Sequence, residues 1–138
     1  MIFTIQGEPH GKGRPRVTRG GKHTYTPKKT KEYENLVKQS FIAECGNQEP
    51  FETHVKMSLY MVFKVPKSAS KKNRELMLNG TIRPTKKPDI DNIIKSVADG
   101  LNGLAYLDDK QIVEIKAIKW YGENPRINVV ISKIDICI

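Results

Sequence analysis

The sequence predicts a single α+β domain, residues 1–138, in which a mixed and mainly antiparallel sheet packs against helices. A length of 138 residues suits one domain with a hydrophobic core. Residues 55–65 alternate between apolar and polar side chains, which is the pattern of a half-buried strand. Residues 33–45 repeat apolar side chains at spacings of three, one and four, which indicates the buried face of a helix. The segments 112–121 and 127–138 are rich in Ile and Val and predict two more strands.

Local signals define the N-terminal elements. Residues 2–5 begin a short strand that Gly7 ends, and residues 7–25 then form a loop rich in Gly and Arg. The backbone N–H groups and cations of this loop could approach phosphates, and a merely flexible basic loop is the alternative. Thr26 as N-cap and Pro27 as first helical residue predict the start of the next helix, which ends at Gly46-Asn47.

Two further helices are expected in the second half of the chain. A short one covers residues 70–78 and leads into a turn at Asn79-Gly80. A second begins near Asp91 and ends at Asn102-Gly103. Its buried stripe is predicted to contain Ile94, Val97, Ala98 and Leu101.

Charge is segregated along this basic chain, whose formal net charge is +9. Residues 1–31 hold eight Lys and Arg side chains and one Glu, and residues 64–88 hold the same numbers. Residues 89–114, between this second segment and the last strands, hold six acids and two Lys. Two basic segments and one acidic centre favour a polyanion held by its backbone while carboxylates meet it at one point. A basic protein with scattered lysines is the alternative.

Several classes of protein are disfavoured by the sequence. No apolar run approaches the roughly 18 residues needed to span a bilayer, and residues 1–16 lack the order of a secretory signal. Cys45 and Cys137 have no metal-ligand spacing, and we expect both to be small buried hydrophobes. These features fit a reducing cytoplasm.

The acidic segment carries the candidate chemistry. If Asp89-Ile90-Asp91 is extended, its period of two puts both carboxylates on one side. The helix that follows stacks Asp91, Lys95 and Asp99 on one stripe. Asp108-Asp109 lies in a loop that leads into the next strand and can return to the same neighbourhood. Carboxylates held close together raise one another's pKa unless a cation balances them, so the segment predicts a divalent metal site.

The ligand type indicates the metal. Hard oxygen ligands without paired His or Cys select Mg²⁺, or Mn²⁺, over zinc, and the loop of an EF-hand is missing. Such an ion activates water and neutralises charge on a phosphodiester. Lys95 could orient the attacking water or face the developing charge. The alternative is purely structural, with the acids as helix caps and ion-pair partners of lysines, and Asp99 is the acid that best suits such a role.

Many residues of the acidic segment stand in a recognisable pattern. They are Lys87-Pro88-Asp89-Ile90-Asp91-Asn92, then Lys95, Asp99, Leu101-Asn102-Gly103 and Asp108-Asp109-Lys110-Gln111-Ile112-Val113. This pattern closely resembles the RusA family of Holliday-junction resolvases, which are common among phage and prophage genes. The N-terminal Gly-Lys-Gly-Arg-Pro-Arg and Thr-Tyr-Thr-Pro segments resemble phage-type members and extend the likeness over most of the chain.

The resemblance implies a homodimer that binds four-way DNA junctions in recombination and repair and makes paired, Mg²⁺-dependent nicks. Asp89, Asp91 and Asp109 match the three metal-binding acids of the family, and Lys95 matches its active-site lysine. Asn92 and Asp108 match motif positions with a supporting role. The expected DNA-binding residues are Lys12, Arg14, Arg16, Arg19, Lys86 and Lys87. Pro88 stands where the family often has an arginine.

The sequence is also compatible with two other functions. The chain could be a non-catalytic DNA-binding module whose acidic segment contacts proteins. It could also be a Mg²⁺-dependent nuclease for flaps or single strands on the same scaffold.

Overall fold

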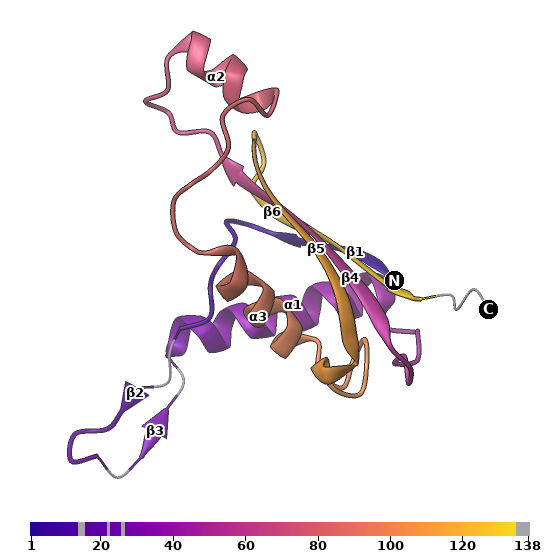
Figure 1. The fold of residues 1–138 in the computed structure, drawn as a ribbon. Coiled ribbons are helices and arrows are strands. Elements are labelled where there is room, and N and C mark those ends of the chain that lie inside the picture. The colour runs from indigo at the N-terminus through magenta and orange to yellow at the C-terminus, as the bar shows by residue number, and fades with distance from the viewer. Residues whose placement is uncertain (14–15, 22, 26, 135–138) are drawn as a thin grey trace.

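The computed structural model describes residues 1–13, 16–21, 23–25 and 27–134. Its central sheet has four strands in the order β1-β6-β4-β5 (Figure 1). These strands are β1 Ile2–Gln6, β4 Val55–Lys64, β5 Ile112–Gly122 and β6 Arg126–Lys133. Strand β6 runs antiparallel to β1 and β4, whereas β5 runs parallel to β4. The predicted α+β domain with a mixed, mainly antiparallel sheet is therefore confirmed.

Strand β4 lies between the two strands that follow each other at the end of the sequence. Tyr60 of β4 pairs with Ile118 of β5 on one side and with Asn128 of β6 on the other. The short connection after Gly122 therefore crosses the end of β4 instead of closing a hairpin. Strand β5 becomes the edge of the sheet that leads directly out of the acidic segment.

Helices α1 Lys28–Cys45 and α3 Ile90–Gly100 pack together on one face of the sheet (Figure 1). Helix α1 contacts β1, and α3 contacts β5. The core between helices and sheet contains the alternating side chains of residues 55–65 that the sequence predicted, which are Val55, Met57, Leu59, Met61, Phe63 and Val65. On the other face, Ile2 stays 71% exposed and Tyr60 38% exposed. The helices thus bury one face of the sheet, and the start of α3 remains at the surface of the protein.

Two smaller elements project from this body in different directions (Figure 1). Strands β2 Arg16–Val17 and β3 Thr24–Tyr25 form a short hairpin within the segment that we expected to be only a loop. Helix α2 Lys71–Leu78 stands beyond the end of the sheet at which β4 ends, and it is the short helix that the sequence predicted. The start of α3 lies between these two projections.

The boundaries of α1 differ slightly from the prediction. Pro27 is the N-cap and Lys28 the first helical residue, so Pro27 lies one position earlier than expected, and Thr26 lies outside the described residues. Gly46 is the C-cap, as predicted. Cys45 is buried at its end as expected, whereas Cys137 lies outside the described residues.

Helix α3 also corrects the prediction. It begins at Ile90 with Asp89 as N-cap, so Asp89-Ile90-Asp91 is not an extended segment. Its fully buried isoleucine is Ile93, whereas Ile94, which was predicted on the buried stripe, is only partly buried. A Cβ atom at Gly100 would lie 2.9 Å from Val37 Cγ1, so the two helices touch there. The helix ends at Gly100, before the predicted Asn102-Gly103.

Candidate active site

The start of α3 presents two carboxylates to solvent. Asp89 has the extended backbone of an N-cap, but its side chain makes no capping hydrogen bond, and Asp91 lies in the first turn. Negative charge is favoured here because the helix dipole places positive partial charge at the N-terminus. Both residues are exposed, and neither carboxylate has an ion-pair or hydrogen-bond partner among the described residues. Their oxygen atoms are therefore available to a ligand.

The second pair of acids begins a short 3-10 turn, η1 Asp109–Gln111, immediately before β5. The Asp108 carboxylate accepts from the Lys110 backbone N–H at 2.9 Å, and Gln111 Oε1 accepts from the Asp108 N–H at 2.9 Å. Gln111 Nε2 donates to the carbonyls of Phe51 and Thr53, both at 2.8 Å. The sequence pattern gave Gln111 no role, yet it fixes this acidic turn against the segment that precedes β4.

The two neighbouring carboxyls of this turn differ in acidity. The hydrogen bond from the Lys110 backbone lowers the pKa of Asp108. Partial burial raises the pKa of Asp109, and the hydrogen bond with Asp108 raises it further. A cation bound beside these two carboxyls would favour the charged form of both.

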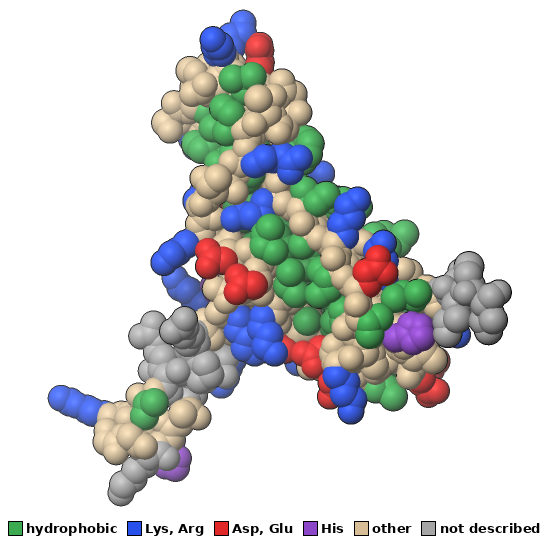
Figure 2. Space-filling model, in the orientation of Figure 1, with side chains coloured by type: hydrophobic (Ala, Val, Ile, Leu, Met, Phe, Trp, Pro, Cys, Tyr) green, Lys and Arg blue, Asp and Glu red, His purple; other side chains and the backbone are tan. Residues whose placement is uncertain are grey.

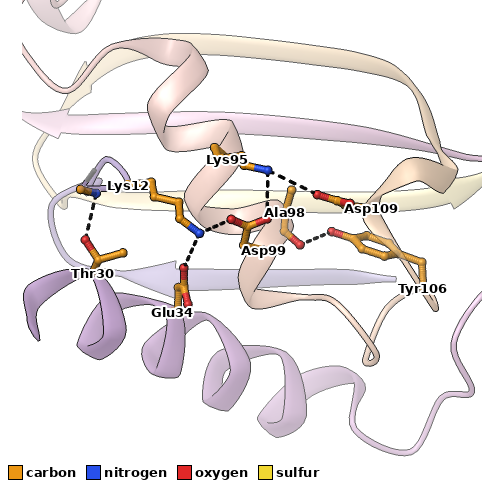
Figure 3. Close-up of polar contacts among 9 residues, drawn as sticks. Lys12, Thr30, Glu34, Lys95, Ala98, Asp99, Tyr106 and Asp109 are labelled. Carbon is orange, nitrogen blue, oxygen red and sulfur yellow. Dashed lines mark hydrogen bonds and ion pairs between the residues drawn. The ribbon is translucent and has the colours of Figure 1, made fainter. Parts of the chain in front are cut away.

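A chain of alternating charges connects the acidic turn to helix α1 (Figure 3). Lys95 Nζ lies 3.8 Å from Asp109 Oδ2 and 3.4 Å from Asp99 Oδ1. Asp99 also contacts Lys12 Nζ, which lies 3.2 Å from Glu34 Oε1. The hydrogen bond to Asp99 is the main reason why the pKa of Lys12 is raised. The predicted stripe of Asp91, Lys95 and Asp99 thus has its second and third members in contact.

Tyr106 anchors the end of α3, the helix that carries Lys95 and Asp99. Its hydroxyl donates a 2.7 Å hydrogen bond to the carbonyl of Ala98, and its side chain is fully buried (Figure 3). Burial raises the pKa of Tyr106 well above its ordinary value, so it remains a neutral donor. The bond fixes the last turn of α3 to the segment that leads into η1. Sequence reasoning missed this residue, since nothing distinguishes a buried tyrosine that holds a site from one that only fills the core.

The N-terminal loop packs directly against the start of α3. The Lys12 backbone N–H donates to the Asn92 carbonyl at 3.1 Å. A Cβ atom at Gly11 would lie 2.9 Å from Pro88 Cβ and 3.1 Å from Asn92 Cβ, so only glycine allows this approach. An open cavity of about 590 Å³ lies beside this contact and is lined by Pro9, His10, Gly11, Lys12, Lys87, Pro88, Asp89 and Asn92. The loop therefore forms one wall of the candidate site.

The basic residues expected to bind DNA lie in several places. Lys12 is inside the charge network, and Arg14 lies outside the described residues. Arg19 is exposed in the turn of the β2–β3 hairpin, where Arg16 begins β2. Lys86 and Lys87 are exposed just before α3.

Lys119, which the sequence did not single out, fixes residues 86–88, the segment that leads into α3. It donates to the carbonyls of Lys86 at 2.7 Å and Pro88 at 3.1 Å. Glu114 pairs with Lys56 at 3.4 Å, so its charge has a neighbouring cation within the sheet.

The donors fit a hard divalent cation by their chemistry, although they are not assembled around one. Among residues 1–13, 16–21, 23–25 and 27–134, no three Asp, Glu, His or Cys side chains are arranged to hold a metal ion. Asp109 faces the ammonium of Lys95, while Asp89 and Asp91 leave their oxygens without partners in that part of the chain. Unpartnered carboxylates of this kind are the ligands that Mg²⁺ and Mn²⁺ prefer.

The fold and site together define a class. A basic α+β protein that exposes two carboxylates at one helix start and pairs a lysine of the same helix with a third acid suits action on a nucleic acid backbone. The model of the family Endodeoxyribonuclease RusA matches residues 6–132. The chain belongs to this family, as its motif indicated, and is therefore placed among nucleases.

A bacterial relative matches the chain over nearly its whole length. The chain is 40% identical over 141 residues to the "Uncharacterized protein YqaN" of Bacillus subtilis (strain 168), and the match covers 96% of each chain. None of the helices in the described ranges is both long and apolar enough to cross a membrane.

Proposed function

We propose that this protein is a structure-selective, Mg²⁺-dependent endonuclease that resolves Holliday junctions by paired symmetric nicks during DNA recombination and repair. One observation carries the proposal. Asp89 and Asp91 at the start of α3 expose carboxylates without partners among the described residues. One turn further along α3, Lys95 pairs with Asp109 of η1. Membership of an endodeoxyribonuclease family supplies the class of substrate.

Each site residue has a distinct proposed role. Asp89, Asp91 and Asp109 would hold Mg²⁺ or Mn²⁺, and such an ion would supply Lewis-acid activation of water and neutralise charge on the phosphodiester. Lys95 turns from Asp109 toward the charge that develops on the phosphate. The backbone carbonyl of Asn92 accepts the hydrogen bond from Lys12 that holds the wall of the site. Asp108 caps the turn that carries Asp109.

Positive charge around the site holds the DNA backbone. We assign this contact to Lys12, Arg14, Arg16, Arg19, Lys86 and Lys87. Lys12 has a second task because it is paired with Glu34 and Asp99, so its loss would also disturb the charge network.

A homodimer suits such a substrate. A four-way junction is two-fold symmetric, and two active sites related by one axis meet two symmetric phosphodiesters. Two subunits also double the number of phosphates that a chain of 138 residues can contact.

The direct test compares nicking of a labelled four-way junction with and without Mg²⁺ by the wild type and by Asp91→Asn. We expect nicking to require the metal and to be lost in Asp91→Asn, while junction binding persists. Glu114→Gln is the control because it removes one acid of the same segment that lies outside the proposed site. Nicking that persists in excess chelator or in Asp91→Asn would refute the metal mechanism.

Substrate selectivity is measured with the same protein. Rates on intact junctions, flaps, single strands and plain duplex are compared at equal concentration. A resolvase strongly favours the junction, whereas equal or faster nicking of flaps or single strands would replace the proposal by another nuclease. Binding without nicking of any of these substrates would indicate a non-catalytic module.

A further inference from the structure

We propose that residues 66–87, which we call the α2 arm, form a second phosphate-binding surface. This surface grips the DNA backbone beyond the phosphodiester that meets the carboxylates. The inference rests on the proposed function for the identity of the substrate. It concerns a part of the molecule that contributes nothing to the site described above except its last residues, Lys86 and Lys87.

The arm stands away from the rest of the protein (Figure 1). Helix α2 has no buried residue, in contrast to α1 and α3. An isolated helix of eight residues is marginal in water, so this one depends on its few contacts with β5. An element that the core does not need for burial is available for another purpose.

Positive charge is concentrated on this arm without matching acids. Five exposed lysines have no ion-pair partner among the described residues, and they are Lys67, Lys71, Lys72, Lys86 and Lys87. Glu75 is the arm's single acid, and the cation of Arg74 is already paired with Glu123. In the space-filling view, Lys and Arg side chains lie at the tip of the arm beside one acidic side chain (Figure 2).

The position of two of these lysines works against the stability of the helix. Lys71 and Lys72 occupy the first turn of α2, where no acidic residue is present. The helix dipole places positive partial charge at this end, so cations here are unfavourable and an anion is favoured. Ser70 satisfies the N–H of Asn73 at 3.2 Å, and the helix start is thus capped but electrically unbalanced. A bound phosphate would balance it.

The base of the arm is held in a defined orientation. Arg83 stacks over the ring of Trp120 at 3.9 Å and donates to the carbonyls of Gly80 at 3.1 Å and Lys119 at 3.0 Å. Gly80 has a φ of +86°, and a Cβ atom there would lie 2.4 Å from the Trp120 ring. The arm is therefore fixed to β5 before any ligand binds, which lowers the ordering cost of binding.

The charge of the arm also decides between two occupants. A second copy of the chain carries a net charge of +9, so its average field repels the arm. Of the large apolar side chains of the arm, Met77 and Ile82 are packed against the core and Leu78 is 38% exposed, which is too little apolar surface for a stable protein contact. A polyanion matches the arm, and in this family it is DNA.

The test is the double variant Lys71→Glu/Lys72→Glu, with Lys116→Glu/Lys133→Glu as matched control. All four lysines are exposed, and both variants change the charge equally. Glutamate in the first turn favours the helix, so weaker binding would not arise from a melted arm. Binding of a fluorescein-labelled synthetic four-way junction is measured in chelator over a series of salt concentrations.

We expect Lys71→Glu/Lys72→Glu to weaken binding by about tenfold or more and to reduce the slope of log affinity against log salt by about 2, one for each phosphate that the variant no longer neutralises. The control should change the slope by clearly less. Trp120 is the only tryptophan and lies at the base of the arm, so its emission should respond to the junction in the wild type but not in the arm variant.

An unchanged slope in the arm variant would overturn the proposal. So would unchanged junction affinity together with a smaller sedimenting mass, since the arm would then bind a second copy. The assay contains no metal, so its result is independent of nicking. A wild type that binds through the arm but never nicks would remove the proposed enzyme and leave the arm in place.

Discussion

Asp99 joins the N-terminal loop to the candidate site, and its replacement by Asn tests that connection. Asp99 contacts Lys12 Nζ and lies 3.4 Å from Lys95 Nζ. Asparagine keeps the shape of the side chain and can still accept one hydrogen bond, but it removes the negative charge between two cations. Lys12 retains Glu34 at 3.2 Å and is not left alone.

The magnitude follows from the burial of the pair. The side chains of Asp99 and Lys12 are 15% and 26% exposed, respectively. Exposed ion pairs contribute roughly 0.2–1 kcal/mol, and breaking fully buried pairs costs about 3–5 kcal/mol. We therefore expect Asp99→Asn to lower the free energy of unfolding by about 1–3 kcal/mol.

The pH dependence has a defined sign. The pKa of Lys12 is raised above its ordinary value of 10.5, chiefly by the hydrogen bond to Asp99. The stabilisation is thus complete below pH 10.5 and decreases as the pH rises through the higher pKa of the folded state. The difference between wild type and Asp99→Asn should stay constant from neutral pH to about pH 9 and shrink above pH 10.5.

The assay is urea unfolding followed by circular dichroism. Glu32→Gln serves as control because it breaks the pair of Lys28 and Glu32, whose side chains are 90% and 62% exposed and whose charged atoms lie 3.8 Å apart. This control should cost less than about 0.5 kcal/mol. If Asp99→Asn costs no more than the control, the charge network does not hold the loop to the site.

Three further substitutions test other parts of the structure. Leu101→Ala should cost about 2–5 kcal/mol in urea unfolding, because Leu101 is fully buried, and a loss below about 0.5 kcal/mol would contradict its place in the core. Tyr106→Phe should cost about 0.5–1.5 kcal/mol in the same assay, because it removes the hydrogen bond to the Ala98 carbonyl; an unchanged midpoint would show that the bond contributes nothing. Gly80→Ala forces a Cβ into the Trp120 ring at a positive φ, so the emission of the only tryptophan should shift, and an unaltered spectrum would mean that this contact is absent.

The sequence predicts most of the fold because its elements differ in period. The alternation along β4 and the helical spacing in α1 each bury one face, and both patterns match the burial seen in the structure except at Leu36, which was predicted on the buried face of α1 and is 40% exposed. The order of the strands could not be predicted, since β4 pairs with partners far along the chain and no local pattern encodes that choice. The hairpin of β2 and β3 was missed because strands of two residues are too short to show a period.

The candidate site was predicted by residue type and only partly by arrangement. The contact of Lys95 with Asp99 follows from helical spacing, and that of Lys95 with Asp109 depends on how the chain returns after α3. The prediction that Asp89-Ile90-Asp91 is extended was wrong, because Asp89 is the N-cap of α3 and the helix begins at Ile90. Tyr106 acts through a contact to a backbone carbonyl, which leaves no signature in the sequence. Gln111 forms a capping box with Asp108, and the spacing Asp-x-x-Gln was the signal that could have indicated it.

The central claim is that Asp89, Asp91 and Asp109 together form a binding site for a divalent cation at the start of α3. The most direct measurement is an anomalous difference map from crystals soaked in Mn²⁺, collected at the manganese absorption edge. We expect a peak at bonding distance from carboxylate oxygens of these three residues, with Lys95 turned away from Asp109. A map without a peak at this position, in which Lys95 still contacts Asp109, would contradict the claim.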